Sequence, residues 1–149
     1  MAMRKIPSNH KYFEFTQVNP KDRRTTDCVI RSIALIEGRP WEEILREMTE
    51  FGIKLGYIFN DKPCIEKYLA TKGYIKLPAP VRKDNSRYTG REFLKDHPNR
   101  NFDIIMKIGG HHITACRNGK ICDTWDSSLG AVCNYWVKEQ PGIYTEKIY

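Results

Sequence analysis

The dipeptide Asn118-Gly119 lies between two runs of alternating residues and constrains the fold more than any other feature of this sequence. Both central residues of a type I′ turn need a positive φ, which asparagine and glycine adopt at little cost. The dipeptide therefore predicts a two-residue β-hairpin with strands over residues 112–117 and 120–125. In that hairpin Arg117 lies opposite Lys120, so the pairing of every earlier residue is set.

Counting back from the turn places Thr114 opposite Asp123 and His112 opposite Trp125. Side chains alternate between the two faces of a strand, so these four residues share one face and His111 points to the other. Asp123 is then the diagonal neighbour of His112, within reach of its ring. The register predicts a histidine held by a carboxylate with a tryptophan alongside.

A second constraint is the apolar segment 28–37, which follows Thr26 and Asp27. A side-chain oxygen of Thr26 or Asp27 is suited to cap a helix that begins at Cys28. Apolar side chains cover more than one face of that helix, which predicts burial at the centre of the domain. Its polar interior residues are Arg31 and Ser32.

A thiol in the first turn of a buried helix suggests nucleophilic chemistry. A helix N-terminus and a nearby imidazolium both stabilise a thiolate, so we expect the pKa of Cys28 to lie below the free value of about 8.5. His112 would be the base, with Asp123 as its orienting carboxylate and the Cys28 N–H as an oxyanion donor. His111 is the alternative base if the strand starts in another register.

Along the rest of the chain, apolar residues recur at helical spacing before about residue 100 and at strand spacing after it. This order predicts an α+β domain with a helical N-terminal half packed on a C-terminal antiparallel sheet. A single domain over residues 1–149 is expected, with 1–24 as an N-terminal extension, 25–100 mostly helical and 101–149 forming the sheet. Further helices are expected from Pro40 to Gly52, Asp61 to Gly73 and Arg91 to Asp96, and further strands over 12–15, 74–77, 102–108 and 131–137.

Composition narrows the functional classes. No apolar run approaches the roughly 18 residues of a membrane span, and no signal-peptide core follows Met1, so we expect a cytoplasmic protein without membrane contact. Five unevenly spaced cysteines suggest free thiols.

The positive charges that give the chain its net charge of +7 are scattered along the sequence, which favours a solvated basic surface over a nucleic-acid site. Without a CxxC pair, and with Cys116 and Cys122 on opposite faces, no metal or cofactor is expected.

The order of Cys28, His112 and Asp123 resembles that of the papain-like cysteine peptidase superfamily, and the segments 26–34, 112–115 and 120–126 look like its compact phage and bacterial branch. The triplet 123–125 is similar to the Asn-Ser-Trp of papain-type enzymes. The resemblance implies a papain-like fold with its active site in the groove between helices and sheet. At the offset where those enzymes carry an oxyanion-hole glutamine, this chain has Asp22.

The resemblance further implies a peptidase, amidase or isopeptidase that acts on a peptide or protein through an acyl-enzyme. Gln17, Asn19 or Thr26 would replace the missing oxyanion donor, with Trp125 supporting the site. One alternative is a non-catalytic basic module that binds nucleic acid or an acidic protein. A second is a transglutaminase-like acyl transferase.

Overall fold

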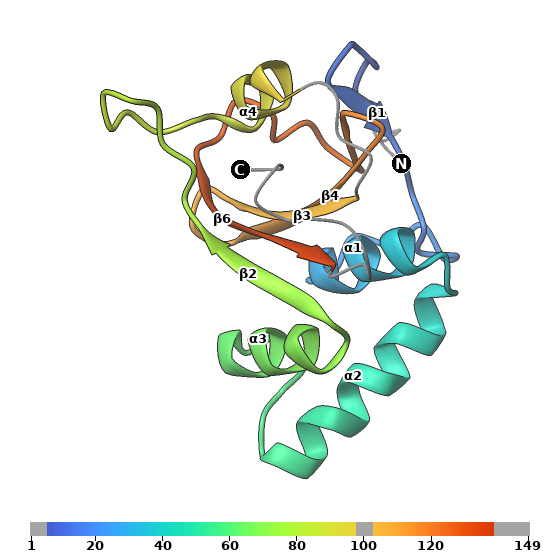
Figure 1. The fold of residues 1–149 in the computed structure, drawn as a ribbon. Helices are drawn as coiled ribbons and strands as arrows, with labels where there is room; N and C mark the ends of the chain where they lie inside the picture. The colour runs from blue at the N-terminus through green and yellow to red at the C-terminus, as the bar shows by residue number, and fades with distance from the viewer. Residues whose placement is uncertain (1–5, 98–102, 139–149) are drawn as a thin grey trace.

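The computed structural model describes residues 6–97 and 103–138, which form one six-stranded sheet with helices on both faces (Figure 1). The strand order is β1-β5-β4-β3-β6-β2. Figure 1 shows α1, α2 and α3 on one side of the sheet and α4 on the other. Along the chain the elements are β1 (Phe13–Phe15), α1 (Cys28–Glu37), α2 (Trp41–Leu55), α3 (Lys62–Thr71), β2 (Tyr74–Pro78), α4 (Gly90–Asp96), β3 (Ile104–Ile108), β4 (His112–Arg117), β5 (Lys120–Asp123) and β6 (Val132–Lys138).

The α+β class is confirmed, but the prediction of a C-terminal antiparallel sheet is wrong in two respects. The strands from β5 to β2 are antiparallel, whereas β1 runs parallel to β5, with Phe13 opposite Ile121. The sheet also takes both of its edge strands, β1 and β2, from outside the segment 101–149 that was expected to form it. Alternating apolar and polar residues identify a strand but do not specify the strand with which it pairs, so the sequence pattern could not predict these pairings.

The hairpin register is confirmed over residues 115–117 and 120–122, whereas the predicted pairs of Thr114 with Asp123 and of His112 with Trp125 lie beyond the last pair of the ladder. Arg117 pairs with Lys120 across the turn, and both turn residues of Asn118-Gly119 have positive φ, at 53° and 74°. The second strand ends at Asp123, two residues before the predicted end. Thr124 donates its backbone N–H to the Asp123 carboxylate at 2.7 Å, a local bond that competes with strand pairing.

The helices begin and end close to the predicted residues, with one extension. Gly52 does not end α2, which continues to Leu55 and ends at Gly56 in the left-handed conformation. Gly52 is buried inside the helix, where an added Cβ would meet the Tyr57 carbonyl. Thr89 caps α4, and it forms a reciprocal capping box with Glu92.

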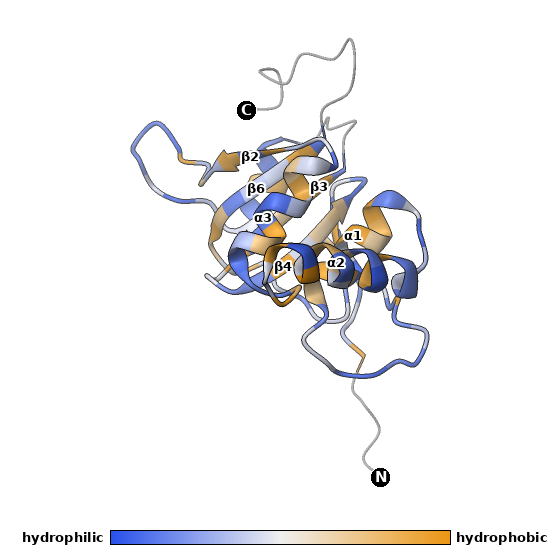
Figure 2. Cartoon of the chain, turned by 90° about the horizontal axis from the view of Figure 1, so that it is seen from below, coloured by the Kyte–Doolittle hydropathy of each residue, from blue (hydrophilic) through white to orange (hydrophobic). Residues whose placement is uncertain are grey.

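Two apolar clusters cover the two faces of the sheet. The cluster on one face joins α1, α2 and α3 to Ile105 and Ile113, and the cluster on the other joins α4 to Ile104 and Met106. Figure 2 shows α1 orange along much of its length and α2 both blue and orange, as expected of a central and a surface helix. None of the helices formed by residues 6–97 and 103–138 combines the length and apolar character needed to cross a membrane.

Candidate active site

Cys28 is the first residue of α1, and the helix docks this residue beside β4. The ladder between β4 and β5 includes no pair before Ala115 and Cys122, and near the start of β4 the backbone of Ile113 bonds to α1. The Ser32 hydroxyl donates to the Cys28 carbonyl at 2.7 Å and also lies 3.2 Å from the Ile113 carbonyl. The Ile113 N–H also hydrogen-bonds to the Cys28 thiol. Helix α1 therefore occupies the edge of β4 beyond the last pair with β5, which fixes the position of the sulfur.

His112, the first residue of β4, is held by a buried carboxylate. Its Nε2 lies 2.7 Å from Asp123 Oδ2, and the Thr114 hydroxyl donates to the same oxygen at 2.7 Å. Asp123 is only 3% exposed. Since an ionised carboxylate only accepts hydrogen bonds, Nε2 carries the proton and the other ring nitrogen, Nδ1, is left for the bond with the Cys28 thiol. The structure thus brings the three predicted residues together, with His112 bonded to Asp123 and interacting with the Cys28 thiol.

Trp125 lies against the imidazole, as the register predicted. The centroids of the Trp125 and His112 rings are 4.5 Å apart, and the planes are tilted by 46°. The indole is 48% exposed, so one side covers the imidazole and the other meets solvent. Trp125 therefore limits the access of water to the bond between His112 and Asp123.

The environment of each group favours a thiolate and imidazolium pair. Burial alone would raise the pKa of the Cys28 thiol, but hydrogen bonds from His112 and the Ile113 N–H and the positive charges of His112 and Arg31 lower it below its usual value. Burial opposes the charge on His112 too, yet the hydrogen bonds with Asp123 and Cys28 raise its pKa to about 9. The pKa of Asp123 is lowered, because the His112 bond and the Arg31 charge outweigh burial.

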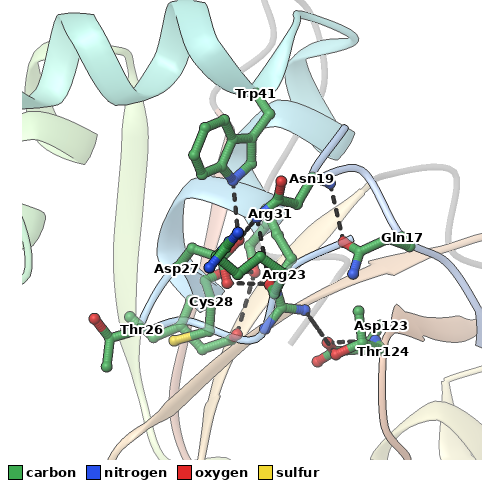
Figure 3. A network of polar contacts seen from close by, with 12 residues as sticks. Gln17, Asn19, Arg23, Thr26, Asp27, Cys28, Arg31, Trp41, Asp123 and Thr124 are labelled. Carbon is green, nitrogen blue, oxygen red and sulfur yellow. Dashed lines mark hydrogen bonds and ion pairs between the residues drawn. The ribbon is translucent and has the colours of Figure 1, made fainter. Parts of the chain in front are cut away.

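Arg31 is a site residue that the sequence analysis noted only as a polar position in α1. Its Nη1 donates to Asp123 and, at 3.2 Å, to the Thr124 hydroxyl, and its Nε donates to Asp27 at 2.9 Å. Figure 3 shows this guanidinium between Asp27 on one side and Asp123 with Thr124 on the other. The side chain is 12% exposed. Arg31 therefore ties α1 to the end of β5.

Asp27 occupies the N-cap position of α1, but its side chain does not cap the helix. The carboxylate instead accepts from Arg31, from Trp41 Nε1 at 2.9 Å and from Asn19 Nδ2 at 3.3 Å (Figure 3). The prediction of a side-chain cap from Asp27 is therefore wrong. Three competing donors hold the carboxylate, so it leaves the first-turn N–H groups of α1 to another acceptor.

The three candidate oxyanion donors have different positions. Asn19 is buried and its amide donates to Asp27 and to the Arg23 carbonyl, so it supports the loop before α1. Gln17 donates to Asp22 at 3.0 Å. Thr26 is exposed beside Cys28, and its carbonyl accepts from Asn60 Nδ2 at 2.7 Å.

Cys28 opens into a cleft of about 400 Å³ between α1 and the start of β4. Thr26, Asn60 and Trp125 contribute to its walls, so Asn60 brings an amide that the sequence analysis did not consider. His111 is exposed on the same wall, whereas His112 is the histidine bonded to Asp123.

The other candidate ligands are dispersed. All five cysteines are free, and three of them are buried at Cys64, Cys116 and Cys122. Asp126 lies 2.7 Å from the ring of His10, away from the His112 pair. Within the part of the chain that the structure describes, no group of three or more His, Cys, Asp or Glu side chains is placed to hold a metal ion.

No family model matches this chain, and neither does any curated protein or solved structure.

Proposed function

We propose that the protein is a papain-like cysteine hydrolase that cleaves an amide or ester bond through an acyl-enzyme. The observation that supports this best is that His112, bonded to Asp123, lines the same cleft as Cys28 and interacts with its thiol. A nucleophile at the start of a buried helix, with its base and orienting acid on neighbouring antiparallel strands, is the arrangement of papain-like enzymes that the sequence resembles. Cys28 also faces a cleft large enough for a short stretch of polypeptide.

The reaction begins with the Cys28 thiolate, whose proton resides on His112 Nδ1. The sulfur attacks the carbonyl carbon, a C–S bond forms, and the carbonyl electrons move to the oxygen. When the tetrahedral intermediate collapses, the bond to the leaving nitrogen breaks and Nδ1 delivers its proton to the amine. His112 then takes a proton from water, which attacks the thioester and releases the acid. Asp123 keeps the second proton on Nε2 throughout.

The oxyanion is stabilised by the start of α1. The Cys28 N–H lies at the N-terminus of this ten-residue helix, where no carboxylate cap competes for the first-turn donors. The amide of Asn60, on the wall of the same cleft, supplies a side-chain donor in place of the glutamine that papain-type enzymes use. Thr26 shapes this side of the cleft through its carbonyl bond to Asn60.

Thiol alkylation tests this proposal, with Cys133 as an internal control because both thiols are half-buried. Iodoacetamide is added at pH 6.5, and peptide mass spectrometry measures the rate at each cysteine. We expect Cys28 to react at least about tenfold faster than Cys133, because its pKa is lowered. The variant His112→Ala should remove this difference. Equal rates in the wild-type protein would refute an activated nucleophile.

The pH dependence separates hydrolysis from simple thiol reactivity. Cleavage of internally quenched peptides should fall as the pH rises through about 9, because His112 then loses the proton that the leaving amine requires. Alkylation needs only the thiolate, so its rate should not fall over that range. A cleavage rate that keeps rising above pH 9 would contradict the role assigned to His112. Release of an amine-coupled product in the presence of free amines would identify acyl transfer in place of hydrolysis.

A further inference from the structure

The cleft at Cys28 continues into a second hollow on one side of Trp125. This hollow measures about 420 Å³ and is lined by Arg23 and Arg24. It shares Thr25, Arg31 and Trp125 with the cleft, so the two form a continuous surface. A substrate chain that places a carbonyl at Cys28 would therefore extend past Trp125 to the two exposed arginines. We refer to this hollow as the arginine side.

The cleft also extends in the direction of β3. A smaller hollow of about 130 Å³ there shares Asn60, Ile65, His111 and Ile113 with the cleft. Two further cations, Lys62 and Lys107, contribute to its lining. We refer to this hollow as the lysine side.

The positive charges on both sides are available to a ligand. Among residues 6–97 and 103–138, the side chains of Arg23, Arg24, Lys62 and Lys107 have no ion-pair partner.

The carboxylates that line the two hollows are already bound by other side chains of the protein. Asp27, on the arginine side, is bound by Arg31 and Trp41. Glu66, on the lysine side, is bound by Lys76 at 2.5 Å. The surface on either side of the nucleophile therefore presents uncompensated positive charge.

From this arrangement we infer that the substrate is an acidic polypeptide that lies across Cys28, with carboxylate side chains on both sides of the cleaved bond. This inference rests on the proposed function, because an acyl-enzyme can form only from a substrate with an acyl carbon. Nucleic acid would also be attracted to these four cations, but its phosphodiester offers no carbonyl for Cys28. Arginine forks bind carboxylates in two-pronged geometry, which suits the arginine side to Asp or Glu.

Binding to a Cys28→Ala protein tests the inference independently of catalysis. Three labelled peptides of equal length are compared by fluorescence anisotropy, with Glu at the flanking positions, with Gln at the same positions, or with Lys. We expect the Glu peptide to bind about tenfold more tightly than the Gln peptide at low salt, with the Lys peptide weakest. This preference should decrease as salt is added.

Charge reversal then assigns the preference to each side. In the Cys28→Ala background, R23E/R24E should reduce the preference for Glu over Gln to about twofold or less, and K62E/K107E should act in the same direction. The matched control K83E/R87E makes the same change in net charge on the exposed 81–87 loop, which lines neither hollow. The control should retain most of the preference.

Three results would overturn the inference. They are equal affinity for the Glu and Gln peptides, a loss in the control as large as in the cleft variants, and displacement of the Glu peptide by a DNA oligonucleotide that binds more tightly. In the wild-type protein, the Glu peptide should also be cleaved with a higher kcat/KM than the Gln peptide. If Cys28 alkylates no faster than Cys133 while the binding preference holds, the proposed function fails and the acidic ligand remains.

Discussion

Replacing Arg31 by methionine would remove the charge that lies between two buried carboxylates. Asp27 and Asp123 are each 3% exposed, and Arg31 binds both. Removing one partner of a buried ion pair costs about 3–5 kcal/mol, because an uncompensated charge remains in the interior. Asp27 keeps its bond from Trp41, and Asp123 keeps its bond from His112. We therefore expect Arg31→Met to lower the free energy of unfolding by about 3 kcal/mol at pH 7.

The loss should depend on pH in a direction set by Asp123. Burial raises the pKa of this carboxyl, but the His112 bond and the Arg31 charge together hold it below its ordinary value. A group with a lowered pKa in the folded state stabilises the protein above its unfolded pKa of about 3.9, and this stabilisation is lost as the pH falls through the folded value. The difference between the wild-type and Arg31→Met proteins should therefore be full near pH 7 and shrink below about pH 4.

Urea unfolding followed by tryptophan fluorescence at pH 7 and pH 3 measures both effects. The conservative variant Arg31→Lys keeps the charge without the planar fork, so it should lose about half as much stability as Arg31→Met. The matched control is Arg46→Met, which removes an exposed ion pair with Glu42 on α2 and should cost less than about 1 kcal/mol. If Arg31→Met lowers the free energy of unfolding no more than this control does, or by the same amount at both pH values, Arg31 does not stabilise the two buried carboxylates.

Three further substitutions test separate parts of the structure. Trp125→Ala should lower kcat several-fold with little loss of stability, because the half-exposed indole covers His112; a pure rise in KM would contradict this. Thr89→Ala removes the capping box of α4 and should cost about 1 kcal/mol in urea unfolding, whereas Thr89→Ser should cost little. Gly52→Ala should cost more than about 1 kcal/mol, because its Cβ would meet the Tyr57 carbonyl; a stabilised protein would show that α2 can shift.

The parts of the fold that the sequence predicted depend on local signals. The turn at Asn118-Gly119 sets the register, and alternation then predicts that His112, Thr114 and Asp123 lie near one another. The start of α1 at Cys28 followed from polar residues placed before an apolar run.

The rest depends on contacts between distant segments. The pairing of β1 with β5 joins residues more than 100 positions apart, and no alternation pattern specifies the partner of a strand. Arg31 shows the same limit, because its position in α1 marked it as polar and buried without naming Asp123, 92 residues later. For the same reason the sequence predicts a local cap at Asp27, although Trp41 and Arg31 bind its carboxylate.

The environment of position 123 also explains why this chain carries an acid there. Asp123 Oδ1 accepts from Arg31 and from the Thr124 backbone N–H, and Oδ2 accepts from His112 and the Thr114 hydroxyl. Both oxygens thus face donors, and a carboxylate satisfies all of them.

An asparagine at this position would turn its NH₂ group toward one of these two sets of donors. Facing Arg31, the amide would oppose a guanidinium that has no lone pair to accept its hydrogens. Facing His112, it would force Nε2 to accept and move the ring proton to Nδ1, so a neutral imidazole could no longer take the proton from Cys28. Arg31 on α1 therefore makes an acid at position 123 necessary, and the same guanidinium that stabilises Asp123 selects the tautomer that leaves Nδ1 of a neutral His112 without a proton.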